Sequence, residues 1–402
     1  MNQPGVNLIK LSPIDLFFSG PESRPSNMGF WFEGRLDPKP LRESLAALAE
    51  LYFPIKGQLV EVDPTVLALG NFDRAPELEH VELASLPVDD ELQLMSQFEA
   101  ASNLPGGKLL ALKLFTSERH SVLVISFSHV LGDAAAFFDF IMDWVQLAAG
   151  RKVEPPSFDR EVFRRIGESM KFDPRKLNLH DPALAKRNHG FIGEGPRPSV
   201  AREDFLGVKR TLFKRAEVET LREAASTEPG RPATLFSTFA SEAWRAKAEE
   251  NRAANEEETV LVCPVDLRRV LPEIPPRFFG NAIKGVSSTK KTSDVLAASA
   301  GQRAEWVRSA VQSVTRENLG LDFHLLDFMR KVRGYKKVQS LRASQGNSLL
   351  VSDMSFAPLR FIRFQGKTSF KVSMLSFYAN SAALMEHPEG YELVRARVRG
   401  RE

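Results

Sequence analysis

The segment Ser128–Phe138 contains the two residues whose types and spacing could do chemistry. It has the sequence S-H-V-L-G-D-A-A-A-F-F, so His129 precedes Asp133 by four positions. A histidine, whose pKa is ordinarily close to neutrality, can take a proton from a substrate hydroxyl or amine as a general base. The same spacing also fits a loop histidine followed by a helix-capping aspartate. From these residues alone both interpretations stand.

Other kinds of catalytic site find little support in the sequence. It contains neither a G-x-S-x-G nucleophile elbow nor a glycine-rich phosphate loop. No further candidate metal ligand lies near His129 and Asp133, and the single cysteine, Cys263, excludes a Cys-based zinc site and an internal disulfide. We therefore expect no metal and no permanently bound cofactor, and the lone cysteine favours a reducing compartment.

A buried strand and a helix are expected to position His129. Residues Ser121–Phe127 are almost wholly apolar, as in a strand that is covered on both faces, and a helix rich in Ala and Phe is expected from Asp133 to Ala149. In α/β sheets, ligands usually bind at the carboxyl ends of the strands. His129 follows such an end directly.

Strands and helices alternate along both halves of the chain, which predicts two similar α/β units. Between them, residues 151–200 contain six prolines and many charges, which we interpret as a crossover linker with a short helix near Arg160–Met170. A long surface excursion of one domain is the alternative. The predicted organisation is an N-terminal domain (1–150), the linker (151–200) and a C-terminal domain (201–402).

The remaining expected elements follow from hydrophobic periodicity and capping signals. A helix start is expected at Ser12–Asp15, the other helices are 37–51, 89–100, 216–226, 234–251, 293–314 and 319–332, and the other strands are 28–33, 59–62, 66–69, 109–116, 209–213, 259–264, 281–289, 348–352, 369–378 and 391–398.

Composition excludes several classes of protein. Of 402 residues, 54 are Lys or Arg and 51 are Asp or Glu, a balance that gives no electrostatic footprint for nucleic acid or an anionic membrane. No apolar run approaches the roughly 18 residues of a spanning helix, and the N-terminus has no signal-peptide pattern. We expect a cytoplasmic monomer. Its 29 Phe against 4 Trp and 4 Tyr suit a dry core or an apolar tunnel.

Six segments, in order along almost the whole chain, resemble the BAHD acyltransferases of the chloramphenicol-acetyltransferase and condensation-domain superfamily. The segment around His129 and Asp133 resembles the HxxxDG motif of that family. The other similar segments are Leu11–Phe18, Leu36–Leu45, Phe53–Val60, Thr234–Trp244, and Pro264–Arg269 followed by Phe278–Ile283.

The resemblance implies two α/β domains of the chloramphenicol-acetyltransferase type, with mixed sheets and flanking helices, joined by a crossover segment and enclosing a tunnel at their interface. An acyl-CoA would enter from one face and a small hydrophobic natural product from the other. His129 would take the proton of the acceptor hydroxyl or amine, and CoA would leave as the thiol. Asp133 would hold the loop geometry, which agrees with the capping interpretation.

The sequence departs from the family pattern at several positions. Ala134 replaces the glycine of HxxxDG, and Ser352–Lys367 resembles the segment that contains the DFGWG motif only degenerately. The tryptophan that can donate to the acyl carbonyl falls on Met354, and the aspartate of DFGWG falls on Arg363. In the family this aspartate pairs with the second arginine of an R-x-R segment, and that position is Val270 here. Since both partners of the ion pair are replaced, we expect no unpaired charge.

The loss of the tryptophan bears on function, because an oxyanion donor can contribute about 3–4 kcal/mol. Ser352 and Asn281 are candidate replacement donors. The leading hypothesis is an acyl-CoA-dependent O- or N-acyltransferase. The alternatives are a cyclase or condensing enzyme of secondary metabolism that uses His129 without CoA, and a non-catalytic binding protein.

The alignment also suggests substrate-binding residues. Met28, Phe30 and Phe32 would line the acceptor side, with simple core packing as the alternative, and Phe278 and Phe279 would flank the acyl pocket. Lys284 and Ser352 are candidates for binding CoA, and solvated surface is the alternative for Lys284. Asn281 and Met354 complete the predicted tunnel lining. The sequence does not specify the acyl group, the acceptor, or whether the product is an ester or an amide.

Overall fold

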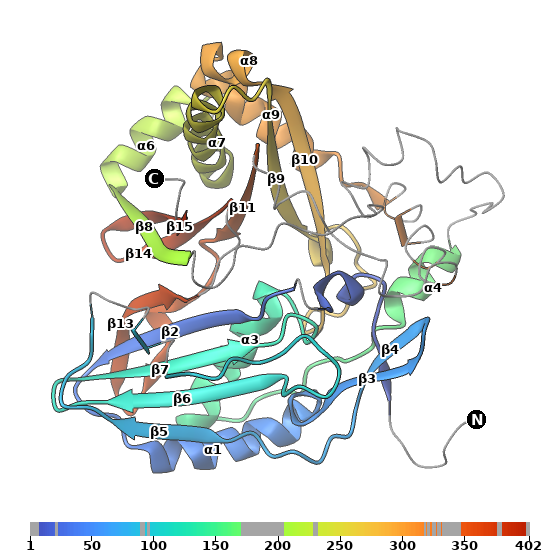
Figure 1. Cartoon of the computed structure of the whole chain (residues 1–402), viewed down its shortest axis with the longest axis vertical. Helices are drawn as coiled ribbons and strands as arrows, with labels where there is room; N and C mark the ends of the chain where they lie inside the picture. The colour runs from blue at the N-terminus through green and yellow to red at the C-terminus, as the bar shows by residue number, and fades with distance from the viewer. Residues whose placement is uncertain are drawn as a thin grey trace.

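The computed structural model describes residues 8–20, 23–88, 93–94, 97–169, 205–227, 232–316, 319, 322–323, 327, 331, 347–375 and 380–398. The described strands form two six-stranded sheets and a three-stranded sheet. Figure 1 shows one large sheet in the lower half, with α1 and α3, and the other in the upper half, with α6 to α9 above it. The predicted pair of α/β units is therefore present.

The N-terminal sheet has the strand order β12-β13-β2-β7-β6-β5 and is antiparallel except between β5 and β6. Two of its strands, β12 and β13, come from the C-terminal half of the chain, and Met374 of β13 lies opposite Met28 of β2. The two sheets thus do not divide the chain at a single point. The strands are β2 (Ser26–Glu33), β5 (Leu78–Glu82), β6 (Leu110–Thr116), β7 (His120–Phe127), β12 (Arg363–Phe364) and β13 (Lys367–Met374).

Both faces of this sheet are covered, which explains the apolar sequence of β7. Helices α1 (Pro38–Leu51) and α3 (Ala134–Ala148) pack against each other and share one hydrophobic cluster with Phe30 and Phe32 of β2. Trp31, between them in sequence, faces the opposite side and packs with Leu86 and Phe98. Alternate side chains of a strand point to opposite faces, so one strand serves both layers.

The C-terminal sheet has the order β10-β9-β11-β14-β15-β8, with β11 parallel to both of its neighbours. Its strands are β8 (Phe205–Lys214), β9 (Glu258–Asp266), β10 (Ile283–Lys291), β11 (Ser348–Met354), β14 (Ser381–His387) and β15 (Gly390–Val398). The helices are α6 (Arg215–Ala224), α7 (Leu235–Ala253), α8 (Thr292–Ala297) and α9 (Ala300–Gln312). Thr234 caps α7 as predicted, because its hydroxyl accepts from the Ser237 amide at 3.1 Å.

The prediction of a single helix over residues 293–314 is wrong. The chain forms α8 and α9 instead, and Ser299 between them caps α9 by accepting from the Gln302 amide at 3.1 Å. Strands β5 and β14 were not expected from the sequence. The helix predicted over residues 89–100 does not extend to residue 100, because residues 97–100 are not helical. Most of the helix predicted over residues 319–332 lies outside the described residues.

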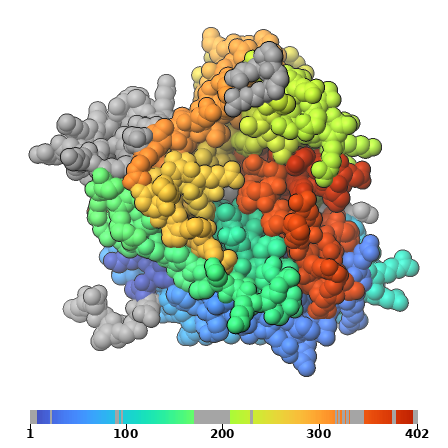
Figure 2. All heavy atoms as spheres, turned by 180° about the vertical axis from the view of Figure 1, so that it is seen from behind, coloured from blue at the N-terminus to red at the C-terminus, as the bar shows by residue number. Residues whose placement is uncertain are grey.

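The crossover contains helix α4 (Val162–Ser169), close to the predicted short helix, and residues 170–204 lie outside the described part. Seen from behind, the red segment after residue 347 runs from the C-terminal unit down onto the N-terminal one (Figure 2). The remaining elements are β1 (Ile9–Lys10), β3 (Gln58–Asp63) and β4 (Val66–Gly70) of the small sheet, and the 3-10 helices η1 (Asp15–Phe18), η2 (Phe53–Lys56), η5 (Leu267–Arg269) and η8 (Leu359–Phe361). Among the described helices, none is long and apolar enough to cross a membrane.

Candidate active site

His129 lies just beyond the carboxyl end of β7, in a loop that hydrogen bonds hold in shape. The side-chain oxygen of Asn103 accepts from the His129 amide at 3.0 Å and from the Ser128 hydroxyl at 2.5 Å. The Leu131 amide donates to the Ser128 carbonyl at 3.0 Å. The half-buried His129 side chain thus extends from a fixed backbone.

Two side chains restrain the His129 ring. Phe18, at the end of η1, stacks on its face with 3.8 Å between the ring centroids and 4° between the planes. At the ring edge, His129 Nδ1 lies 3.2 Å from Oδ1 of the buried Asn281. The contacts fix both the plane of the ring and its rotation.

The orientation of the Asn281 amide determines which ring nitrogen carries the proton. Its nitrogen Nδ2 donates to the His129 carbonyl at 2.8 Å and to Asp15 Oδ1 at 2.9 Å, and neither oxygen can donate in return. Oδ1 therefore faces Nδ1, which must be the protonated nitrogen. Nε2 is left with its lone pair, as a general base requires.

This arrangement gives Asn281 a different role from the predicted one. Both of its amide hydrogens are already donated, to Asp15 and to the His129 carbonyl, so neither is left for an oxyanion. The structure corrects the expectation that Asn281 could replace the missing tryptophan donor. Its side chain orients the histidine instead.

The surroundings of His129 keep its imidazole neutral at pH 7. Removal of the ring from water lowers its pKa. A hydrogen bond to its own backbone, the charge of Asp133, the hydrogen bond that the ring donates to Asn281 and the charge of Asp15 offset this effect only in part. A neutral ring with a free Nε2 can accept a proton, so the pKa and the geometry agree.

Asp133 holds the start of α3 against the C-terminal unit. As the capping interpretation predicts, its Oδ1 accepts from the Ala136 amide at 3.1 Å. Oδ2 accepts from Arg268 Nη1 at 2.9 Å and from the Ala282 amide at 2.8 Å. Asp133 is 2% exposed and makes no hydrogen bond to the His129 ring, so its contacts are those of a residue that shapes the loop.

A close approach of backbones explains the glycine before Asp133. A Cβ at Gly132 would lie 2.6 Å from the Cβ of Ala136 and 3.4 Å from backbone atoms of Gly280. The His129 loop and the Phe278–Ala282 loop therefore pack backbone to backbone. This contact brings Asn281 to His129.

Most of the predicted tunnel residues are buried in the cores. Met28, Phe30 and Phe32 belong to the main N-terminal cluster, which is the core-packing alternative for these positions. Phe279 joins the same cluster, whereas Phe278 belongs to the C-terminal cluster. Their proposed contact with substrate stays a prediction.

The candidates near CoA have differing surroundings. Lys284, 9% exposed, forms an ion pair with the buried Asp322, which gives its charge a structural partner. Ser352 on β11 is half-buried, and its hydroxyl has no hydrogen-bond partner within the described part of the chain. Met354 is 7% exposed and packs in the N-terminal cluster, and Arg363 is exposed and donates to the Gly366 carbonyl. Binding of CoA by Lys284 and Ser352 stays a prediction.

Four residues that hold the ring or the loop of His129 were not expected from the sequence. Asp15 and Phe18 come from η1, Asn103 from the loop before β6, and Arg160 from the crossover. The available signal was the helix start predicted at Ser12–Asp15, which the structure confirms. The Ser12 amide donates to Asp15 Oδ2 at 2.8 Å, and the Asp15 amide donates to Ser12 Oγ at 3.1 Å. That signal gave no indication that the cap also faces the site.

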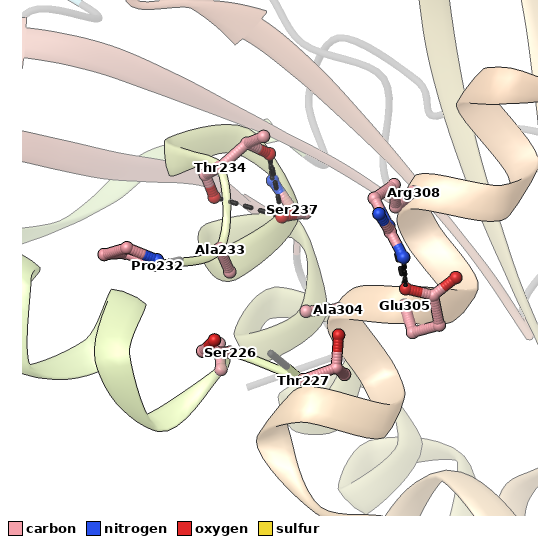
Figure 3. A pocket seen from close by; sticks show the side chains of 10 residues that line it. Ser226, Thr227, Pro232, Ala233, Thr234, Ser237, Ala304, Glu305 and Arg308 are labelled. Carbon is pink, nitrogen blue, oxygen red and sulfur yellow. Dashed lines mark hydrogen bonds and ion pairs between the residues drawn. The ribbon is translucent and has the colours of Figure 1, made fainter. Parts of the chain in front are cut away.

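A separate pocket lies at the N-terminal end of α7, between the end of α6 and α9. Figure 3 shows Thr234 and Ser237 on one side and Arg308 with Glu305 on the other. Arg308 Nε donates to Glu305 Oε2 at 2.8 Å, so its charge is paired within the lining. None of the lining residues contacts His129, and this pocket is not the candidate active site.

The fold and site define an α/β protein of two units, with His129 where the two units meet. A family model described as "Transferase family" matches residues 38–389, and the chain belongs to this family, that of the BAHD acyltransferases. The chain is 24% identical over 379 residues to shikimate O-hydroxycinnamoyltransferase of Nicotiana tabacum, across 88% of this chain and 83% of that protein.

A second relative is similar to this chain over a shorter segment. The chain is 27% identical over 174 residues to hydroxycinnamoyl-CoA:piscidic acid hydroxycinnamoyltransferase of Actaea racemosa, which spans 43% of this chain and 38% of that protein. Among solved structures, F. graminearum TRI101 complexed with coenzyme A and deoxynivalenol is similar with a TM-score of 0.76 and 12% identity, over 98% of this chain and 96% of that one. This likeness confirms the predicted fold class, and the match to the family model places the chain among the acyltransferases.

Proposed function

We propose that this acyltransferase moves an acyl group from acyl-CoA to a hydroxyl or amine of a small hydrophobic acceptor, with His129 Nε2 as the general base. The orientation of Asn281 carries the proposal. Its Nδ2 is held by Asp15 and by the His129 carbonyl, so its Oδ1 accepts from Nδ1 and Nε2 is left to take a proton.

The proposed reaction has two steps. As the acceptor oxygen or nitrogen attacks the thioester carbonyl carbon, its proton moves to His129 Nε2 and a tetrahedral oxyanion forms. The carbon–sulfur bond then breaks, and His129 returns the proton to the sulfur, so that CoA leaves as the thiol. The Nδ1–H to Asn281 Oδ1 hydrogen bond keeps the imidazolium in the same orientation throughout.

The oxyanion needs a donor, and Met354 cannot supply one. Ser352 is the candidate that stays open, because its half-buried hydroxyl has no partner within the described part of the chain. We propose that this hydroxyl faces the acyl carbonyl when acyl-CoA is bound. Ser352→Ala should then lower kcat by about 10²-fold or more, as the loss of an oxyanion donor does elsewhere.

The relatives suggest which acyl donors to test first. Two of the similar proteins are named as hydroxycinnamoyltransferases, and TRI101 was solved with coenzyme A. Hydroxycinnamoyl-CoA, acetyl-CoA and malonyl-CoA therefore form the first set of donors. Acceptors should include alcohols and primary amines, so that ester and amide products are both sampled.

Thermal unfolding with these thioesters tests the donor side without a known acceptor. A ligand at about 100 times its Kd should add about 2.7 kcal/mol to the apparent stability. An upward shift of the melting temperature with one thioester would support the proposal. The absence of a shift with every thioester would overturn it in favour of the CoA-independent cyclase.

Turnover then tests His129. His129→Ala should reduce the release of CoA thiol by about 10²- to 10⁴-fold. His120, at the opposite end of β7, provides the matched control, and His120→Ala should retain the wild-type rate. Equal rates for wild type and His129→Ala would refute the role of His129.

A further inference from the structure

We propose that Asp15 is a positioning residue for the His129 base and acts through the Asn281 side chain, with Arg160 balancing its charge. This inference rests on the proposed function. The four residues come from η1, the loop after β7, the start of the crossover and the loop before β10. They meet where the two α/β units contact each other.

Four hydrogen-bond donors converge on the Asp15 carboxylate, which is 0% exposed. Oδ1 accepts from the Asn281 amide nitrogen at 3.1 Å and from Asn281 Nδ2 at 2.9 Å. Oδ2 accepts from the Ser12 amide at 2.8 Å and from Arg160 Nε at 3.0 Å. The carboxylate therefore holds both the backbone and the side chain of the residue that faces the histidine.

Arg160 connects Asp15 to the histidine loop itself. It is 4% exposed, and its Nη2 donates to the Leu131 carbonyl at 2.9 Å and to the Val130 carbonyl at 3.4 Å. Its Nη1 has no partner within the described part of the chain. A buried ion pair with an unused donor contributes little to stability, so positioning explains this pair better.

Helix η1 also contacts both units, which suits a positioning element. Ile14, directly before it, packs in the C-terminal cluster, whereas Leu16 and Phe17 pack in the N-terminal cluster. Phe18 at its end stacks on the His129 ring. In Figure 1 this turn is the dark blue coil between the lower ends of β9 and β10 and the N-terminal sheet. One short turn thus restrains the ring from its face and, through Asp15, from its edge.

The charge of Asp15 prevents the Asn281 amide from reversing. If the amide reversed, its oxygen would face the Asp15 carboxylate and the His129 carbonyl, which are both acceptors. Its nitrogen would face Nδ1, and the ring would move its proton to Nε2 to accept that bond. A histidine protonated on Nε2 cannot act as the base. Asp15 therefore selects the active tautomer from a position that does not contact the ring.

Asp15→Asn tests this mechanism with almost no change of shape. An asparagine can turn an NH₂ group toward Asn281, which allows the reversed amide. NMR of ¹⁵N-labelled histidine, with the His129 signal assigned by its loss in His129→Gln, should show the Nδ1–H tautomer in the wild type and a mixture in Asp15→Asn. The kcat should fall by about 10- to 100-fold, with KM for the acyl-CoA within about twofold.

Asp143→Asn is the matched control. Asp143 is also a buried acid, 6% exposed, but it pairs with Tyr52 and Arg277 rather than with the histidine network. This variant should lose stability to a similar degree and keep the wild-type tautomer and kcat. A loss of kcat in Asp143→Asn equal to that in Asp15→Asn would show that only general destabilisation is measured and would overturn the inference.

A double-mutant cycle tests whether Asp15 acts through Asn281. If it does, Asp15→Asn should lower kcat no further in an Asn281→Ala background, whereas independent effects would multiply and contradict the inference. Arg160→Lys keeps the positive charge but cannot make all three hydrogen bonds of the guanidinium group. It should therefore shift the tautomer of His129 less than Asp15→Asn does. If Asp15→Asn does not fold, Arg160→Lys provides the test. A wild-type tautomer in these variants would overturn the inference while leaving the proposed function intact. A fully active His129→Ala would remove the proposed function itself.

Discussion

Replacing Asp133 with alanine should destabilise the folded protein far more than a typical surface substitution. The carboxylate is 2% exposed and has three separate partners. It caps α3 at the Ala136 amide, it accepts from the Ala282 amide, and it forms an ion pair with Arg268 at 2.9 Å. Alanine removes all three interactions.

The expected loss follows from these partners. Loss of the helix cap costs about 1 kcal/mol. The buried Ala282 amide, left without an acceptor, costs about 1–3 kcal/mol. Removal of one partner of a buried ion pair costs about 3–5 kcal/mol, but Arg268 keeps Asp266 at 3.1 Å and two backbone carbonyls, which places this loss below that range. Since the three losses overlap, we expect about 4 kcal/mol in total.

Urea unfolding followed by circular dichroism measures this difference, and Asp133→Asn is the informative control. Asparagine caps a helix as well as aspartate does, but its NH₂ group cannot accept from the Ala282 amide. This variant therefore keeps the cap, loses the charge and that hydrogen bond, and should lose about 1 kcal/mol less stability than Asp133→Ala. Arg268→Ala should have little added effect in the Asp133→Ala background, because the two residues share one interaction. A loss below about 1 kcal/mol for Asp133→Ala, or equal losses for alanine and asparagine, would refute this reasoning.

Two further predictions concern protonation. Removal from water lowers the pKa of His129, so kcat/KM should be retained above neutrality and should fall on acidification. The midpoint of this fall should lie below about 6.5, the ordinary pKa of histidine. A midpoint above about 7 in a pH–rate profile would contradict this prediction. Burial raises the pKa of the Cys263 thiol to about 12, so the native protein should not react with Ellman's reagent while the urea-unfolded protein releases one equivalent; rapid reaction of the native protein would contradict its burial. The same property allows Ellman's reagent to follow the release of CoA.

Local features of the fold could be predicted because their causes are local. The apolar run of β7 ends at Ser128, and the capping aspartate follows at Asp133, so the sequence alone placed His129 at a strand end before a helix. Helix starts at Asp37 and Thr234 follow from capping in the same way. In each case the hydrogen bonds that define the feature join residues two or three positions apart.

The break between α8 and α9 shows where this kind of reasoning fails. Apolar periodicity continues across residues 293–314, and it predicts one helix. The Ser299 side chain bonds to the Gln302 amide instead and begins a new helix. A serine inside an apolar pattern can either continue a helix or cap a new one. In the folded chain, α8 and α9 both pack against α7 and β10 as two separate helices.

The sequence by itself determined the family, the α/β class and the position of the candidate base, His129, at the end of a strand, because these depend on motifs and periodicity. Only the tertiary structure decided how the base is held. Asn281 reaches His129 across 152 residues, and Asp15 reaches Asn281 across 266. No local pattern encodes which acceptors surround an amide or whether a lysine such as Lys284 is paired. The direction of the Asn281 amide, and with it the tautomer of His129, depends on hydrogen bonds between segments that only the folded chain brings together.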